Sequence, residues 1–268
     1  MKVTPIGRNT EFDFDSDKHR YRDVDGRLIH GVTKICEMAG EPGWRIPWSA
    51  KMCAEVAEYQ LKNATWKNDK GKTVKIDELL IPDIVRAVRK APQGKGDVAI
   101  DFGHTVHGWL EKFVNYKMGR GKKPTLPENP AVKQSVKSFI EWTKENNPKF
   151  IGAEEVCYYE NGEHDFAGTV DLRFELDGVP CIGDFKTAKD IRKREYVFQL
   201  GLYALAIEQA LGPHIKKLYI FKLPKLEGGT WTNFEVKSFP WTESLKIACQ
   251  EINHLKHLSV DIDRWLKQ

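Results

Sequence analysis

Apolar positions recur along the chain with two different periods, and the period changes from one segment to the next. A spacing of three to four residues, which places apolar side chains along one side of a helix, runs through 101–116, 132–146, 195–211 and 240–258. Alternation or a short apolar run, typical of strands, marks 150–159, 166–176, 179–186, 215–223 and 231–239. The Asp177-Gly178 pair predicts a tight hairpin between the second and third of these strands. We therefore expect an α/β fold, a mixed central sheet flanked by helices.

The first third of the chain has a different organisation. Residues 21–29 alternate around Asp25-Gly26, which predicts a hairpin, and 44–61 and 76–88 have helical spacing. The segment 90–96 is rich in Gly, Lys and Pro and predicts a loop. We expect a mostly helical N-terminal appendage over 1–95, forming one wall of a substrate groove, and a core over 96–268.

Composition excludes several classes of protein. The apolar fraction of 41% and the charged fraction of 30% are ordinary for a globular protein, and a net charge of +4 argues only weakly for nucleic acid. The sequence contains neither an eighteen-residue apolar run nor an apolar signal segment, so we expect no membrane association and a cytoplasmic or otherwise intracellular protein. The five cysteines never form a C-x-x-C pair, which disfavours a zinc ribbon and an iron–sulfur cluster and predicts buried free thiols.

Candidate chemistry is concentrated in residues 166–189. Asp171 lies within one predicted strand, and Asp184 and Lys186 lie two apart at the end of its partner, so the latter two share a face. Two carboxylates from adjacent strands suit Mg²⁺ or Mn²⁺, and a lysine beside them can orient water and offset charge in phosphodiester hydrolysis. A buried Asp–Lys ion pair that ties the strands together would explain the same spacing, and the spacing alone leaves both interpretations open.

Five short motifs then occur in order over roughly residues 100–205, and together they resemble the RecB-like branch of the PD-(D/E)xK nucleases. GTVD resembles the G-x-x-D motif of that family, GDFKT the D-x-K motif and QLGLY the Q-x-x-x-Y helix. DFGHTVHGWLE resembles the helix that carries the histidine, and GAEEV resembles the acidic strand. A looser likeness to the entry region of phage-type exonucleases covers residues 32–55. The motifs span 168–171, 183–187, 199–203, 101–111 and 152–156 respectively.

The resemblance implies a restriction-endonuclease-like core and a role for each matched residue. Asp171, Asp184 and the Phe185 carbonyl would bind the metal, and Lys186 would position the attacking water. His107 would complete or orient the metal shell, whereas without the motif it would be taken for a core histidine.

Glu154 and Glu155 alternate in direction, and only one of them can face the site. We prefer Glu154, because Val156 and Tyr158 would share its face.

A second group of residues is expected to contact or support DNA. Gln199 and Tyr203, one helical turn apart, would support the active site or hold the strand, although they could equally be interface residues. Beside the D-x-K strand lies a basic cluster, which would bind phosphates or form a solvated face. Trp44, Trp48 and Trp66 could stack on bases but are more often core residues. The basic cluster consists of Lys186, Lys189, Arg192, Lys193 and Arg194.

The predicted activity is Mg²⁺-dependent exonuclease digestion of DNA, with Mn²⁺ able to substitute, on single strands or duplex ends. Such an activity suits replication, recombination or repair, including that of a phage acting in its host's cytoplasm. One alternative is an endonuclease of the same superfamily, such as a junction resolvase or restriction enzyme, against which the His107 helix and the Q-x-x-x-Y helix argue. Another is a catalytically silent nucleic-acid-binding module, against which the intact Asp171, Asp184 and Lys186 argue.

Overall fold

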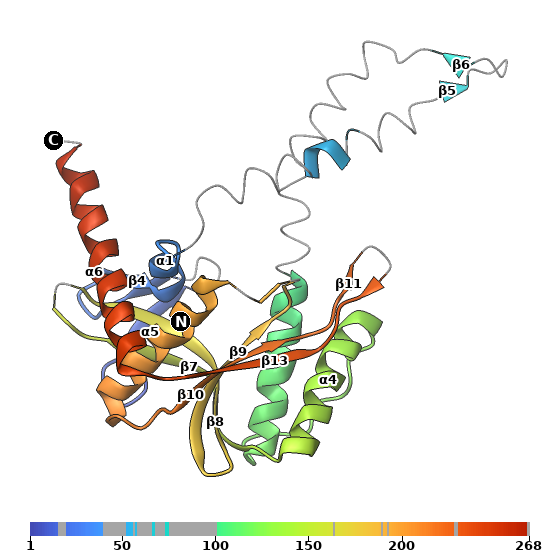
Figure 1. Cartoon of the computed structure of the whole chain (residues 1–268), viewed down its shortest axis with the longest axis horizontal. Coiled ribbons are helices and arrows are strands. Elements are labelled where there is room, and N and C mark those ends of the chain that lie inside the picture. Colours follow the sequence, from blue (N-terminus) through green and yellow to red (C-terminus); the bar gives the residue numbers. More distant parts are fainter. Residues whose placement is uncertain are drawn as a thin grey trace. The chain divides into compact units, whose positions relative to one another are not determined.

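The computed structural model describes the chain in two compact units, Met1–Gly40 with Thr105–Gln268, and Glu41–His104 (Figure 1). The residues described are 1–15, 20–39, 52–55, 57, 66–67, 73–74, 101–162, 164–188, 190–191, 193–227 and 230–266. Within the second unit, β5 (Trp66–Lys67) pairs with β6 (Thr73–Val74). The loop predicted over 90–96, the boundary predicted at residue 95 and most of the two helices predicted over 44–61 and 76–88 lie outside the described residues. The predicted domain division remains a prediction.

A mixed sheet forms the centre of the first unit. Its strands follow the order β1-β2-β3-β4-β8-β9-β10-β13, and β7 pairs with β8. β9 and β10 are parallel, as are β4 and β8, and the other pairs are antiparallel. The strands are β1 (Lys2–Val3), β2 (Phe12–Asp15), β3 (Arg20–Arg22), β4 (Leu28–Gly31), β7 (Lys149–Tyr159), β8 (Phe166–Leu176), β9 (Val179–Lys186), β10 (Lys217–Lys222) and β13 (Glu235–Pro240).

Helices cover the two faces of this sheet (Figure 1). The helical segment 105–117 and α4 (Pro130–Asn146) lie on one face, and α5 (Arg194–Leu211) and α6 (Glu243–Trp265) lie on the other. α4 begins where the Asn129 side chain accepts hydrogen bonds from the backbone N–H groups of Ala131 and Val132. It ends at Asn147, which has a left-handed backbone. The expected α/β architecture with a mixed, helix-flanked sheet is confirmed.

The structure differs from the predicted elements in three places. The expected hairpin near the N-terminus forms from β3 and β4, but β4 also pairs with β8, so the first strands extend the central sheet. β13 begins at Glu235 because β11 (Leu226–Glu227) and β12 (Thr230–Trp231) form a separate small hairpin before it. α6 continues to Trp265, beyond the expected end at 258, because the apolar period continues there through Ile262 and Trp265.

The β8–β9 hairpin determines the register of the functional residues. Asp177 and Gly178 both have positive φ, 52° and 77°, as the predicted tight turn requires. The ladder runs from Leu176↔Val179 to Leu172↔Gly183 and stops there. Beyond that point β4 takes over the same edge of β8, at Phe166 and Ala167. β8 and β9 therefore separate immediately after Leu172 and Gly183.

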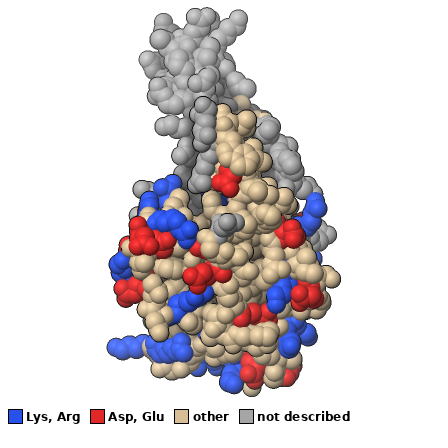
Figure 2. Space-filling model, turned by 90° about the vertical axis from the view of Figure 1, so that its left-hand side faces the viewer, with Lys and Arg blue, Asp and Glu red and all other residues tan. Residues whose placement is uncertain are grey.

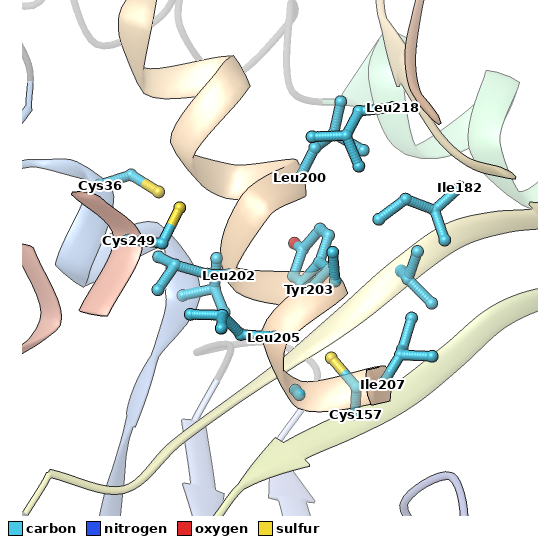
Figure 3. Packing of buried hydrophobic residues seen from close by; sticks show 14 of the residues in the cluster. Cys36, Cys157, Ile182, Leu200, Leu202, Tyr203, Leu205, Ile207, Leu218 and Cys249 are labelled. Carbon is cyan, nitrogen blue, oxygen red and sulfur yellow. The ribbon is translucent and has the colours of Figure 1, made fainter. Parts of the chain in front are cut away.

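A large core lies between the sheet and α5 (Figure 3). Leu200 and Tyr203 of α5 pack against Ile182 of β9 and Leu218 of β10, with Cys157 of β7 nearby. Cys36 and Cys249 approach one another from α1 (Val32–Cys36) and α6 (Figure 3). All five cysteines are free, and four of them are buried, as expected for buried thiols.

Positive and negative side chains are mixed on the one face of the molecule that Figure 2 shows. On the face shown in Figure 2, Lys and Arg side chains are interspersed with Asp and Glu side chains. The net charge of +4 is therefore not concentrated on that face. Of the helices that the structure describes, none has the length and apolar character needed to cross a bilayer.

Gly168 provides a test of how closely α5 packs on β8. A Cβ atom at Gly168 would lie 2.5 Å from the Tyr203 ring and 2.8 Å from Val32. We expect Gly168→Ala to lower the free energy of unfolding by about 1–3 kcal/mol through overpacking, measured by urea denaturation. Gly108, in the helical segment 105–117, has no atom within 4 Å of such a Cβ, so Gly108→Ala is the control. Equal stability of the two variants would contradict close packing at Gly168.

Candidate active site

The two predicted carboxylates lie where β8 and β9 separate. The register would place Asp171 opposite Asp184, but the ladder ends one pair earlier, at Leu172↔Gly183. The Asp171 carboxylate instead accepts a hydrogen bond of 2.7 Å from the backbone N–H of Phe185. Both acids are buried, with Asp171 8% and Asp184 1% exposed. The Asp171 side chain thus supplies the acceptor that the Phe185 N–H lacks once the ladder has ended, and this bond keeps the ends of β8 and β9 beside each other.

His107 reaches the same point from the helix layer. Its Nε2 lies 3.0 Å from the Phe185 carbonyl oxygen, and because a carbonyl can only accept, Nε2 carries the proton. Its Nδ1 lies 3.5 Å from Glu154 Oε1 and 3.5 Å from Asp171 Oδ2. His107 therefore contacts two carboxylates and one carbonyl of the predicted site at once.

Glu154 and Glu155 have separate surroundings. Glu154 has a left-handed backbone, with φ of 49°, and the flanking register places it opposite Asp171. Such a backbone is uncommon for glutamate, and strain of this kind is concentrated at functional sites. Glu155 instead accepts two hydrogen bonds, of 2.6 and 2.8 Å, from Arg173. The structure therefore brings Glu154, rather than Glu155, to His107 and Asp171.

Lys186 lies in a chain of polar contacts on the α5 side. Its Nζ lies 2.6 Å from Asp184 Oδ2 and donates to Gln199 Oε1 at 2.9 Å. Gln199 Nε2 in turn donates to the Tyr203 hydroxyl at 2.9 Å. Gln199, which was expected to support the site, therefore contacts Lys186 directly, and Tyr203 contacts it through Gln199.

Tyr196 is a contact of Lys186 that the sequence analysis missed. Lys186 Nζ lies 4.9 Å from the centre of the Tyr196 ring, within range of a cation–π interaction. Tyr196 lies one turn before Gln199 on α5, so the same helical period that relates Gln199 to Tyr203 could have identified it.

Two effects determine the pKa values at the site: burial, and the proximity of the acids Asp171, Asp184 and Glu154 to the bases His107 and Lys186. Burial raises the pKa of Asp184 to about 6, although the Lys186 ammonium opposes the shift, and burial also raises the pKa of Asp171. Burial lowers the pKa of His107, but the carboxylates of Asp171 and Glu154 outweigh it and bring that pKa to about 9. Burial likewise lowers the pKa of Lys186, and Asp184 and Asp171 raise it further than burial lowers it. At neutral pH, with no metal ion bound, both bases are therefore protonated.

The ligand atoms of His107, Glu154 and Asp171 all lie within 4.8 Å of one another. Among the described residues, no other group of three such side chains meets that condition. The Phe185 carbonyl, also predicted as a ligand, adjoins this group through His107. Asp184, also predicted as a ligand, is not a member of this group, and its buried Oδ2 lies 2.6 Å from Lys186 Nζ.

The predicted DNA-contacting cations are described only in part. Lys193 Nζ lies 5.8 Å from the centre of the Tyr196 ring, and Arg194 begins α5. Lys189 and Arg192 lie outside the described residues, as do Trp44, Trp48 and the side chain of Trp66. A role for the basic cluster in binding phosphates stays a prediction.

No protein-family model and no curated protein sequence matches the chain. Similar solved structures include an alkaline exonuclease from Laribacter hongkongensis, which is 7% identical with a TM-score of 0.34, the match covering 60% of this chain and 82% of that chain. They also include an inferred exonuclease from Eubacterium rectale, which is 16% identical with a TM-score of 0.35. That match covers 61% of this chain and 65% of the other. These scores are too low to assign a function, which must rest on the geometry of the site itself.

The raised pKa of His107 predicts how stability depends on pH without metal. Because the folded-state pKa is about 9 and the ordinary value is 6.5, the protonated imidazole stabilises the fold fully below about pH 6.5. That contribution, at most about 3 kcal/mol, is lost as the pH rises through about 9. In EDTA, we expect the free energy of unfolding to decline over this range in the unmodified protein. His107→Gln should have a flatter profile, and parallel profiles would show that His107 does not pair with the carboxylates.

Proposed function

We propose that the protein is a metal-dependent nuclease that hydrolyses phosphodiester bonds of DNA. The observation that carries this proposal is the contact of His107 with Glu154, Asp171 and the Phe185 carbonyl, beside the Asp184–Lys186 pair. A structural ion pair between Asp184 and Lys186 alone would need neither Glu154 nor a histidine. The convergence of several charged groups at the separated strand ends is typical of a functional site.

The residues present fit a hard divalent cation. Glu154 and Asp171 supply carboxylate oxygens of the kind that Mg²⁺ and Mn²⁺ prefer, and His107 Nδ1 adds a nitrogen that Mn²⁺ accepts. The Phe185 carbonyl, predicted as a ligand, is bonded to His107 Nε2, on the other side of the imidazole ring from Nδ1, so in this arrangement it holds the ring and does not reach the same ion. In the metal-free protein the His107 imidazolium supplies the positive charge between these carboxylates. Metal binding would require His107 to release the Nδ1 proton, while Nε2 stays bonded to Phe185. Bound Mg²⁺ would polarise the scissile phosphate and lower the pKa of a bound water.

Lys186 is suited to the remaining part of the reaction. Its ammonium is held by Asp184 on one side and by Gln199 on the other, so its position does not depend on substrate. From there it would orient the attacking water and offset the negative charge that develops on the phosphate in the transition state. Asp184 keeps the lysine protonated, and the Gln199–Tyr203 bond restricts the amide to the rotamer that accepts from Lys186.

The substrate and mode of attack come from the motif resemblance. The RecB-like order of His107, Glu154, Asp171, Asp184–Lys186 and Gln199–Tyr203 favours an exonuclease that starts at DNA ends. Mg²⁺ is the expected cofactor. Lys193, which lies over the same Tyr196 ring as Lys186, and Arg194, the first residue of α5, are candidates for phosphate contacts.

Digestion of end-labelled linear DNA and a covalently closed circle, side by side, tests both the activity and the mode. We expect Mg²⁺ to support digestion of the linear substrate, EDTA to abolish it, and the circle to survive, because an exonuclease requires an end. Cleavage of the circle would replace the exonuclease assignment by an endonuclease one. Absence of cleavage with both Mg²⁺ and Mn²⁺, alongside DNA binding, would identify a silent binding module.

Lys186→Ala separates catalysis from binding. Because Lys186 acts on the water and on transition-state charge, we expect the rate of cleavage to fall by about 10²-fold or more, while DNA binding, followed by fluorescence anisotropy in EDTA, changes little. Lys217→Ala, which removes an exposed lysine of β10, is the matched control and should retain activity. Undiminished cleavage by Lys186→Ala would remove Lys186 from the mechanism.

A further inference from the structure

A second group of metal-ligating side chains lies apart from the proposed nuclease site. Half of the chain's eight histidines gather there: His30 of β4, His164 in the loop before β8, and His254 and His257 of α6. Three segments distant in the sequence thus each bring imidazoles to one place. The proposed nuclease mechanism uses none of these four residues.

The spacing of the four rings suits a shared ion. The ring centres of His164 and His257 are 5.0 Å apart. His30 lies 4.7 Å from His257, and His254 lies 4.7 Å from His164. Two imidazoles that bind one zinc ion through nitrogens about 2.0–2.1 Å away place their ring centres roughly 5 Å apart. Each of these three neighbouring pairs therefore has the ring spacing of two ligands on one ion.

Two polar atoms on the inner side of α6 add an independent observation. His257 Nε2 and Asn253 Oδ1 are both buried, and neither has a hydrogen-bond partner among the described residues. Asn253 and His257 are one helical turn apart, and Asn253 Nδ2 donates to the His164 backbone carbonyl at 2.8 Å. Buried polar atoms are rarely left unsatisfied, so the Nε2 atom of His257 is a nitrogen available to a bound ion.

The protonation of His257 is compatible with such a ligand. Burial lowers its pKa to about 4, and the neighbouring His30 and His164 contribute to the shift. The imidazole is therefore neutral at physiological pH, which is the form that binds metals. Asp165 and Asp261 oppose the shift, but the Asp165 carboxylate is already occupied by Tyr158 and Arg27.

We propose that His164 and His257, completed by the flanking His30 and His254, bind a divalent transition ion of the zinc class. Imidazole nitrogens select such ions over Mg²⁺, which separates this site chemically from the proposed nuclease site. Only the His107 group brings three ligand atoms within 4.8 Å of one another among the described residues, so the four rings close around the ion by rotating about their side-chain bonds. The bound ion fastens α6 and the loop before β8 to β4, and its role is structural.

Zinc content of the full-length protein tests this proposal. The experiment uses His107→Ala as the background, because that substitution removes the histidine of the proposed nuclease site. After dialysis against Zn²⁺ and then against buffer, we expect about one zinc per chain by atomic emission. Zn²⁺ at about a hundred times its dissociation constant should raise Tm by roughly 5 °C or more. Co²⁺ in place of Zn²⁺ should produce the visible absorption of a nitrogen-ligated ion.

Adding His257→Ala or His164→Ala should remove the zinc and the rise in Tm. His254→Gln changes an exposed residue of the cluster, so it tests the site with little risk to folding, and it should weaken zinc binding at least tenfold. His214→Ala, which removes a histidine whose Nδ1 contacts the Gly212 carbonyl, is the matched control and should keep the zinc. His257→Ala in the otherwise unmodified chain should keep the Mg²⁺-dependent cleavage.

Two results would overturn the proposal. One is the absence of bound zinc in the His107→Ala protein, which would mean that the four rings only pack against one another. The other is zinc that persists undiminished in the His164, His254 and His257 variants. Neither result bears on the proposed nuclease activity, which is measured separately with Mg²⁺.

Discussion

The hydrogen bond from the backbone N–H of Phe185 to the Asp171 carboxylate is the interaction on which the candidate site depends. It forms where the β8–β9 ladder has ended, so it keeps two strand ends together that no longer share backbone bonds. With the strands parted, Asp171 meets His107 and Glu154, while Asp184 and Lys186 lie toward α5. An unbroken ladder would place the two carboxylates side by side on paired strands and leave Phe185 without a free carbonyl for His107.

Pairing of each acid with a base lowers the free-energy cost of burying the charges of this site. Each acid has a base within reach: Lys186 for Asp184, and His107 for Asp171 and Glu154. Unpaired, any of these groups would cost several kcal/mol to bury. The same pairing provides the proposed chemistry, because a cation can replace the proton on His107 without any other ionic contact being broken. Stability of the metal-free protein and metal binding are therefore linked through one residue.

Much of the core architecture is visible in the sequence because its signals are local. The strands over 166–176 and 179–186 and their Asp177-Gly178 turn follow from alternation and from two residues that adopt positive φ. The helix bearing His107 and the α5 helix bearing Gln199 follow from their apolar periods. The candidate acids, the lysine and the histidine are all marked by short motifs, so their identity needed no coordinates.

Only the tertiary structure shows which residues from distant parts of the sequence come into contact. No local pattern shows that β4 pairs with β8, or that His30, His164 and His257 come together, because these contacts join residues far apart in the chain. The choice between Glu154 and Glu155 depended on a left-handed backbone at Glu154 and on Arg173 taking Glu155. The sequence by itself thus determined which residues can carry the chemistry. The structure decided which of them meet, since burial and pairing are set by the whole packed sheet.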